Sequence, residues 1–462
     1  MATAYVTPGV YVEEISNLPP SVAGVETAIP AFIGYTQFAT LKTAGDLNMK
    51  PTRITSMVEY EQLFGVADPE TKITVQITGS GSNRQATATL LPTDRKKNIM
   101  WYAVRLYFDN GGGPCYICSV APYKDADEAE LALGLAAVGK VDEPTLIVFP
   151  EAQHLTIAKY ATLHELALQQ CAELQDRFVI MDMHGGDGVS MDDPTTNIIT
   201  AAGTFRTNGI NMDNLKYGAV YTPNIETTVP IQYDPTATIV TPPGGALSGL
   251  QTADTQAYNL SVAAIGNLTC KLPPSGAVAG IYATVDANRG VWKAPANVGI
   301  VDVIQPTIAM TNIDQGSLNV DPTSGKSVNA IRAFTGLGTL VWGARTLAGN
   351  DNEWRYINVR RLCIYLEESI RKATQQFVFE PNDANTWVKV QGMIENFLTT
   401  VWRQGALMGS KPADAFTVSV GLGKTMSGID VLEGRMIVVV ALCPVRPAEF
   451  IILRFVQTMP VS

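Results

Sequence analysis

Charged residues are scarce in this chain of 462 residues, at 16%, against about 25% in typical soluble domains. Much of the surface must therefore be uncharged, as it would be if other protein subunits cover it. Acidic residues outnumber basic residues by 43 to 33, which leaves a net charge of −10. This balance argues against nucleic acid or an anionic membrane as a partner.

Long apolar runs and targeting features are also missing. The longest uninterrupted apolar run, 436–443, is far shorter than the roughly 20 residues of a membrane-spanning helix. The opening stretch MATAYVTPGVYVEE has no basic region and no apolar core, so we expect neither a secretory signal peptide nor direct membrane insertion. The six cysteines are scattered along the chain, which favours folding in a reducing cytoplasm without a disulfide framework.

Motifs for catalysis and cofactor binding are incomplete, so we expect no cofactor and no metal. The segments 325–327 and 423–425 end like phosphate loops, but valine stands where the first glycine belongs in both. The sharpest enzyme candidates are Asp182 and His184, which follow a predicted parallel strand, where open α/β sheets bind ligands. Because no G-x-S-x-G turn supplies a nucleophile, an α/β hydrolase is the least favoured alternative.

The middle of the chain alternates strand and helix patterns. TLIVF at 145–149, FVIMD at 178–182 and YGAVYTP at 217–223 predict buried strands. Apolar residues at spacings of three and four predict a helix over 157–174, and a second helical stretch follows over 195–206. Strands and helices in this order predict a parallel sheet with right-handed crossovers.

Two stretches are expected to interrupt this core. Residues 66–100 contain two alternating polar and apolar runs around a Gly-Ser tip, which predicts an inserted β hairpin. Residues 224–270 are rich in Thr, Pro, Gly and Ala. That composition predicts a surface excursion with little regular structure.

Residues 330–462 predict a separate α+β domain. Apolar stripes indicate one helix over 358–377 and a second over 387–401, which stops at Gly405. Strands are predicted at 416–420, 435–442 and 449–456. The domain carries 14 basic and 11 acidic residues, a net charge of +3, whereas residues 1–329 have a net charge of −13. We therefore expect the two parts to meet different partners.

Several separated blocks carry a resemblance to a known family. The first three are PGVYVEEISNLPPSVAGVETAIPAFIGYT at 8–36, FDNGGGPCYICSV at 108–120 and LPPSGAVAGIYATVDANRGVWKAPAN at 272–297. The longest match runs from NAIRAFTGLGTLVWGARTL at 329–347 through WRYINVRRL and FEPNDANTW to PVRPAEFIILRF at 444–455. Together these blocks resemble contractile tail sheath proteins, which build contractile phage tails and related injection particles.

The resemblance implies a structural role. Sheath subunits stack as rings of six in a helical tube, and contraction drives an inner tube through a target envelope. The implied partners are other copies of the chain, the inner tube protein, and baseplate and terminal cap proteins. Assembly is expected in a bacterial cytoplasm, in a phage tail or in a released or cell-anchored particle. Because the insertions into the core are modest, an injection particle is favoured over a phage tail.

The resemblance also implies an architecture of three parts. Residues 1–25 form an extended linking arm, and residues 26–329 form an outer α/β core that is subtilisin-like but lacks the catalytic apparatus. Residues 330–462 form an α+β domain that the arm completes and that faces the inner tube. A non-contractile shell or binding protein is the principal alternative to a contractile sheath subunit.

Three groups of residues are candidates for contacts between chains. The first two are strand segments, chosen because open strand edges recruit other chains, and the third is basic, chosen because of the charge difference between the two parts of the chain. The linking strand comprises Val10, Tyr11, Val12, Glu13, Glu14 and Ile15. The sheet that accepts such arms comprises Ile437, Val439, Phe450, Ile452 and Arg454. The inner-tube contact candidates are Arg360, Arg361, Arg371 and Lys372.

Overall fold

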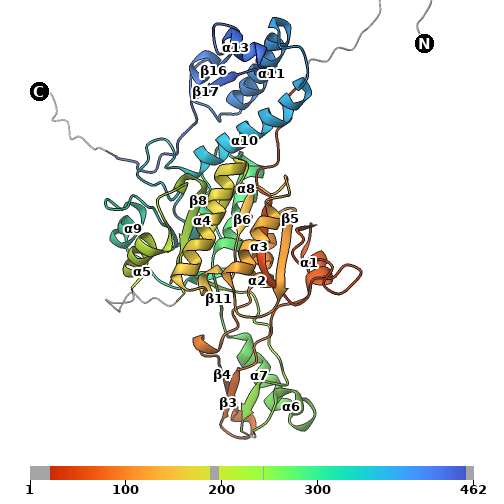
Figure 1. Cartoon of the computed structure of the whole chain (residues 1–462). Helices are drawn as coiled ribbons and strands as arrows, with labels where there is room; N and C mark the ends of the chain where they lie inside the picture. Colours follow the sequence, from red (N-terminus) through yellow and green to blue (C-terminus); the bar gives the residue numbers. More distant parts are fainter. Residues whose placement is uncertain (1–20, 188–196, 243, 454–462) are drawn as a thin grey trace, which may run out of the picture. The chain divides into compact units, whose positions relative to one another are not determined.

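The computed structural model describes residues 21–187, 197–242 and 244–453, and it has a mixed α/β fold (Figure 1). The described residues divide into two compact units. The larger, called the α/β unit below, contains residues 25–368 and 444–453, and the smaller, called the small unit, contains residues 21–24 and 369–443. The predicted linking strand, residues 10–15, lies outside the described residues.

The α/β unit is built on a sheet that has nine strands within the described residues, of which the six central ones are parallel. In spatial order the strands are β12 (Val298–Gly299), β15 (Gly338–Val341), β14 (Asn329–Phe334), β8 (Gly218–Thr222), β7 (Phe178–Asp182), β6 (Leu146–Val148), β1 (Pro30–Thr36), β5 (Cys115–Pro122) and β2 (Thr52–Ile54). The three strands predicted at 145–149, 178–182 and 217–223 are β6, β7 and β8. The prediction of a parallel sheet is confirmed.

Helices cover both faces of this sheet, as the side chains of β1 demonstrate. Phe32 meets the ring of Tyr107, on helix α2 (Met100–Asp109), at 5.5 Å between ring centroids. The next residue, Ile33, lies against Gly134, on helix α3 (Glu128–Val138). Because successive strand residues point to opposite faces, α2 and α3 lie on opposite sides of the sheet. Every residue of β1 is buried, as expected for a strand covered on both faces.

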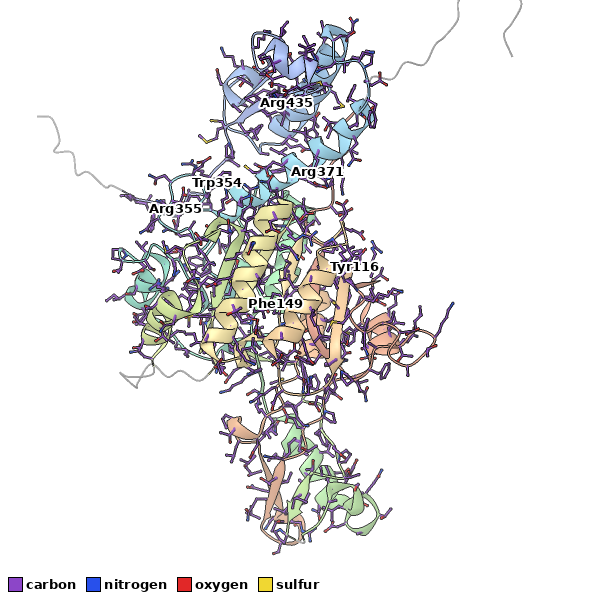
Figure 2. The ribbon with its side chains drawn as sticks, viewed as in Figure 1. Tyr116, Phe149, Trp354, Arg355, Arg371 and Arg435 are labelled. Carbon is purple, nitrogen blue, oxygen red and sulfur yellow. The ribbon has the colours of Figure 1, made fainter. Side chains whose placement is uncertain are left out.

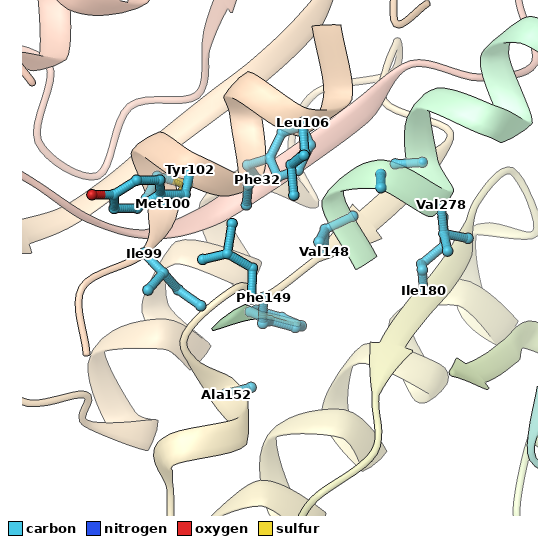
Figure 3. Packing of buried hydrophobic residues seen from close by; sticks show 14 of the residues in the cluster. Phe32, Ile99, Met100, Tyr102, Leu106, Val148, Phe149, Ala152, Ile180 and Val278 are labelled. Atoms are coloured by element: carbon cyan, nitrogen blue, oxygen red, sulfur yellow. The ribbon is translucent and has the colours of Figure 1, made fainter. Parts of the chain in front are cut away.

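Two further long helices complete these layers. Helix α4 (Ile157–Leu174) has the bounds predicted from its apolar stripe. Helix α8 (Ser275–Arg289) packs against α2 and against β7, where Val278 lies beside Ile180 (Figure 3). Shorter helices of the α/β unit outside the predicted insertions include α1 (Met57–Phe64), α5 (Ile198–Thr204) and α9 (Asn312–Asn319). A small second sheet contains β11 (Cys270–Leu272), β9 (Ile225–Thr227) and β13 (Val303–Pro306).

The two predicted insertions fold together. The hairpin is β3 (Thr74–Thr78) and β4 (Gln85–Thr89), as expected. The prediction of little regular structure over 224–270 is wrong, because this stretch contains β10 (Ile239–Thr241), α6 (Leu247–Ala253) and α7 (Thr255–Gly266). Strand β10 pairs with β3, and α7 packs against β4 (Figure 1). The order therefore comes from contacts between segments that are far apart in the chain.

The longer stretch of the small unit begins within helix α10 (Ile357–Thr374). Its other elements are α11 (Ala384–Arg403), α12 (Pro412–Ala415), β16 (Phe416–Val420), α13 (Gly428–Leu432) and β17 (Val438–Leu442). The division falls at 368/369 rather than at the predicted 329/330, because β14 and β15 join the large sheet. Residues 369–443 carry seven basic and six acidic residues, so the small unit is close to neutral.

We predict that Gly276→Ala destabilises the α/β unit. A Cβ atom at Gly276 would stand 2.4 Å from the backbone oxygen of Ala103, so α8 and α2 would have to separate. Overpacking of this kind costs about 1–3 kcal/mol. The matched control is Gly316→Ala in α9, where a Cβ meets no heavy atom within 4 Å. This control should add about 0.5–1 kcal/mol of stability.

Urea unfolding of the full chain measures both variants. Equal midpoints for Gly276→Ala and the unsubstituted chain would show that the contact between α2 and α8 tolerates a methyl group.

Candidate assembly surfaces

Strands β16 and β17 form an antiparallel pair, and no third strand pairs with them in the described part of the chain. On the face toward α11, Phe416, Val418 and Val420 of β16 are buried, at 8%, 7% and 4% exposure. Their partners on β17 across the ladder are only half-buried. A pair of strands with aliphatic side chains and an open edge is a place where another strand can add.

The predicted arm-accepting residues differ in their positions. Val439 lies in β17 and is 51% exposed, and Ile437 directly precedes that strand at 38% exposure. Phe450 and Ile452 are 69% and 76% exposed, whereas Arg454 lies outside the described residues. The strand predicted over 449–456 is not formed at 449–453. The reason is that a strand needs a backbone partner, and the described residues offer this segment none.

Two of the four predicted tube-contact residues are buried. Arg360 is 2% exposed and donates to Glu367 at 2.6 Å. Arg361 is 3% exposed and binds Asp286 of α8 through both terminal nitrogens, at 2.9 and 2.5 Å. Side chains enclosed in this way cannot reach another protein, so the assignment of Arg360 and Arg361 to a contact surface is wrong.

The other two candidates lie in the last turn of α10. Arg371 is exposed and Lys372 is half-buried, and Figure 2 marks the position of Arg371 on this helix. Cations at a helix C-terminus also interact favourably with the helix dipole. These two side chains remain candidates for a contact with another protein.

Asp182 and His184 do not form a catalytic pair. Asp182 accepts hydrogen bonds from the backbone nitrogen and the hydroxyl of Ser275, at 2.8 and 2.5 Å, and thereby caps the first turn of α8. The His184 ring is bonded through Nε2 to the backbone oxygen of Leu155 at 2.9 Å. Both side chains therefore hold neighbouring segments in place. Burial raises the pKa of Asp182 to about 7, against the opposing effect of the two bonds from Ser275.

One well-made site escaped the sequence reasoning. Glu449, in the C-terminal segment, accepts hydrogen bonds from Arg345, Asn319 and Tyr356. The only signal in the sequence is a single acidic residue directly before the apolar run FIIL. An isolated charge beside such a run often has a partner, but the sequence does not say which.

Within residues 21–187, 197–242 and 244–453, no helix combines the length and the apolarity of a membrane span. In the same ranges, no group of three or more His, Cys, Asp or Glu side chains is arranged to hold a metal ion.

Comparison with known proteins identifies the family. Residues 129–347 match the phage tail sheath protein central domain, and residues 349–458 match the phage tail sheath C-terminal domain. The sheath of the anti-feeding prophage in its contracted state is similar over 98% of this chain and 100% of that chain, with 33% identity and a TM-score of 0.65. The chain therefore belongs to the family of contractile tail sheath proteins.

Two further structures are similar over nearly the whole chain. A chain in the baseplate of the anti-feeding prophage is 34% identical, covering 99% of this chain and 100% of that chain, with a TM-score of 0.62. The contracted PVC sheath complex, from an extracellular contractile injection system, is 30% identical over 99% of both chains, with a TM-score of 0.65.

Similarity to two phage proteins is more local. The tail sheath protein of Burkholderia phage BcepMu is 31% identical over 144 residues, which is 30% of each chain. The tail sheath protein of Vibrio phage KVP40 is 25% identical over 40% of this chain and 26% of its own length. The chain thus matches less than a third of either phage protein.

We predict a pH dependence of stability that originates at Asp182. Its pKa is raised from 3.8 to about 7 on folding, so the folded state keeps a proton that the unfolded chain releases. The stabilisation is complete below about pH 4 and is lost as the pH rises through 7. Asp182→Asn cannot titrate, so its free energy of unfolding should fall less between pH 5 and 8, by up to about 1.4 kcal/mol per pH unit.

Urea unfolding at several pH values measures this slope. Glu173→Gln, at an exposed position of α4, is the control and should keep the original slope. An unchanged slope in Asp182→Asn would refute the assignment.

Proposed function

We propose that the chain polymerises as stacked rings of six around an inner tube and contracts to drive that tube through a target envelope. The observation that carries this proposal is the two-stranded sheet β16–β17, which is left with an open edge in a chain of the sheath family. The full-length similarity to two contracted sheaths supports the same role.

Linkage between subunits is the second element of the proposal. Residues 10–15 of one copy pair with the edge of β17 in another, and residues 450–453 supply a further apolar strand. The exposure of Phe450, Ile451, Ile452 and Leu453, between 69% and 78%, supports this pairing, because water disfavours four adjacent apolar side chains. Backbone links of this kind hold while subunits pivot, so the rings can change pitch without separating.

The α/β unit acts as the outer body of the sheath and has a subtilisin-like core without catalytic function. The parallel sheet with helices on both faces supports the comparison. Asp182, the last residue of β7, is bonded to Ser275 of α8, and this supports a structural role for the carboxyl end of that strand. No reaction is assigned to the chain.

The proposed partners are other copies of the chain, an inner tube protein, and baseplate and terminal cap proteins. The match to a chain in a baseplate structure supports the baseplate contact. Assembly takes place in a bacterial cytoplasm. The full-length similarity to the anti-feeding prophage and PVC particles favours an injection particle over a phage tail.

We predict that proline at position 11 or 12 abolishes tube formation. Successive N–H groups of a strand point to opposite sides, so one of Tyr11→Pro and Val12→Pro must remove a donor that faces the neighbouring chain. Tyr11→Thr and Val12→Thr keep the N–H and a β-forming side chain, and both should assemble. Deletion of residues 1–15 should give a folded monomer that forms no tubes.

Electron microscopy of the chain expressed alone and together with its tube protein records the outcome. Normal, contractile tubes from the deleted chain would exclude the linking arm. Uniform small particles from the unsubstituted chain would exclude the sheath itself, and tubes of fixed length would favour a non-contractile shell.

A separate prediction concerns Arg371 and Lys372. Reversing both to Glu should weaken assembly on the inner tube, and the defect should shrink at high salt because ions screen exposed charges. Lys389→Glu combined with Lys411→Glu, both at exposed positions of the small unit, is a control with the same change in net charge. Equal co-sedimentation of the reversed and unsubstituted chains with tubes, at low and high salt, would rule out this contact.

A further inference from the structure

The segment that follows β17 makes few hydrogen bonds to other described residues of the α/β unit. After Cys443 the chain returns to that unit at Pro444, and residues 444–453 contain neither helix nor strand. The backbone oxygen of Val445 accepts from the Asn358 side chain at 3.2 Å. Apart from this bond, the hydrogen bonds found between this segment and other described residues all converge on Glu449.

The Glu449 carboxylate receives donors from three side chains. Arg345 binds it in a bidentate manner, with Nε 2.9 Å from Oε1 and Nη2 2.6 Å from Oε2. The Asn319 amide donates to Oε1 at 2.7 Å, and the Tyr356 hydroxyl donates to Oε2 at 3.2 Å. Bidentate, charge-assisted bonds are among the strongest that side chains form, and they fix orientation as well as distance.

The partners of Glu449 are themselves rigidly held. The Arg345 side chain is 4% exposed, and its backbone is bonded in both directions to the Asn329 side chain, at the start of β14. Burial alone would raise the pKa of Glu449, but the bonds from Arg345 and Asn319 outweigh it and the pKa lies below its usual value. The carboxylate is therefore charged, and it is linked to β14 of the large sheet through Arg345 and Asn329.

Immediately beyond this anchor, the character of the chain changes. The four residues 450–453 are apolar and 69–78% exposed. A well-paired anchor directly before an exposed apolar segment is the arrangement expected where an extended segment must start from a defined point. Force applied to residues 450–453 would pass through Glu449 and Arg345 to the large sheet and not to residues 444–448.

We propose that Arg345 and Glu449 are positioning residues, forming a clasp that fixes the root of the C-terminal linking segment on the α/β unit. This inference rests on the proposed function, in which residues 450–453 reach another copy of the chain. The clasp sets the position and direction from which that strand leaves, and it resists detachment of the segment when the sheath contracts.

Chymotrypsin cleavage of the unassembled full-length chain tests the clasp directly. A protease must bind several residues on each side of the cut in an extended form, so cleavage after Phe450 is slowed while the preceding residue, Glu449, is held by Arg345. Release of the fragments that follow Phe450 is measured by mass spectrometry. Cleavage after Phe379, which is fully exposed in the small unit, serves as the internal reference. Relative to that reference, Glu449→Gln should raise cleavage after Phe450 about tenfold, because it removes the charge-assisted bonds.

A matched control has a similar ion pair away from the segment. Arg360 and Glu367 are also joined at 2.6 Å by a buried guanidinium and a partly exposed carboxylate. Glu367→Gln should leave cleavage after Phe450 unchanged. Tyr356→Phe and Asn319→Ala remove single neutral donors and should each raise cleavage about two- to threefold. These two variants decide the question if Glu449→Gln fails to fold.

Tube assembly of the same variants then separates the two proposals. Faster cleavage after Phe450 together with fewer or shorter tubes is the expected result. Equal cleavage in all variants would overturn the clasp, whatever tubes they form. If Glu449→Gln is cleaved faster yet assembles and contracts normally, the clasp exists but does not position the linking segment, and the inference is wrong. Absence of tubes from the unsubstituted chain would instead count against the proposed function.

Discussion

A guanidinium group that is removed from water must be paired with an anion, and this constraint organises the α/β unit. An unpaired buried charge costs several kcal/mol, so the segments that supply the carboxylates are held firmly where the arginines are. Arg361 fixes α10 against Asp286 of α8, and it also donates to the backbone of Thr27, just before β1. Arg345 in the same way fixes Glu449 and the C-terminal segment.

The two units differ in how many of their strands have backbone partners on both sides. In the large sheet, the central strands have partners on both sides and helices on both faces. In the small unit, the pair β16–β17 has an open edge within the described residues and half-buried aliphatic side chains. The small unit is therefore the part of the described chain that keeps strand backbone groups available to another chain.

Much of the fold could be predicted because its signals are local. A short run of residues is enough to show the pattern of each element that was predicted: apolar runs for β6, β7 and β8, the helical spacing of apolar residues for α4, and polar and apolar alternation for the hairpin β3–β4. The long-range pairing of β10 with β3 has no such signal, and so 224–270 was expected to be irregular. The division between the units differs from the predicted one for the same reason, since the pairing of β14 with β8 and with β15 joins segments that no local pattern connects.

The candidate sites also divide into features with a local sequence signal and features that depend on contacts between distant segments. Residue order and composition alone determined the family, the absence of a nucleophile motif, the apolar character of residues 450–453 and the strand-like pattern of residues 10–15. Only the tertiary structure decided which charged side chains are available. Arg360 and Arg361 lie on the polar side of their helix by spacing, but the helix packs against other elements on that side as well. Helical periodicity specifies an angle around an axis, whereas burial depends on what the rest of the chain places there.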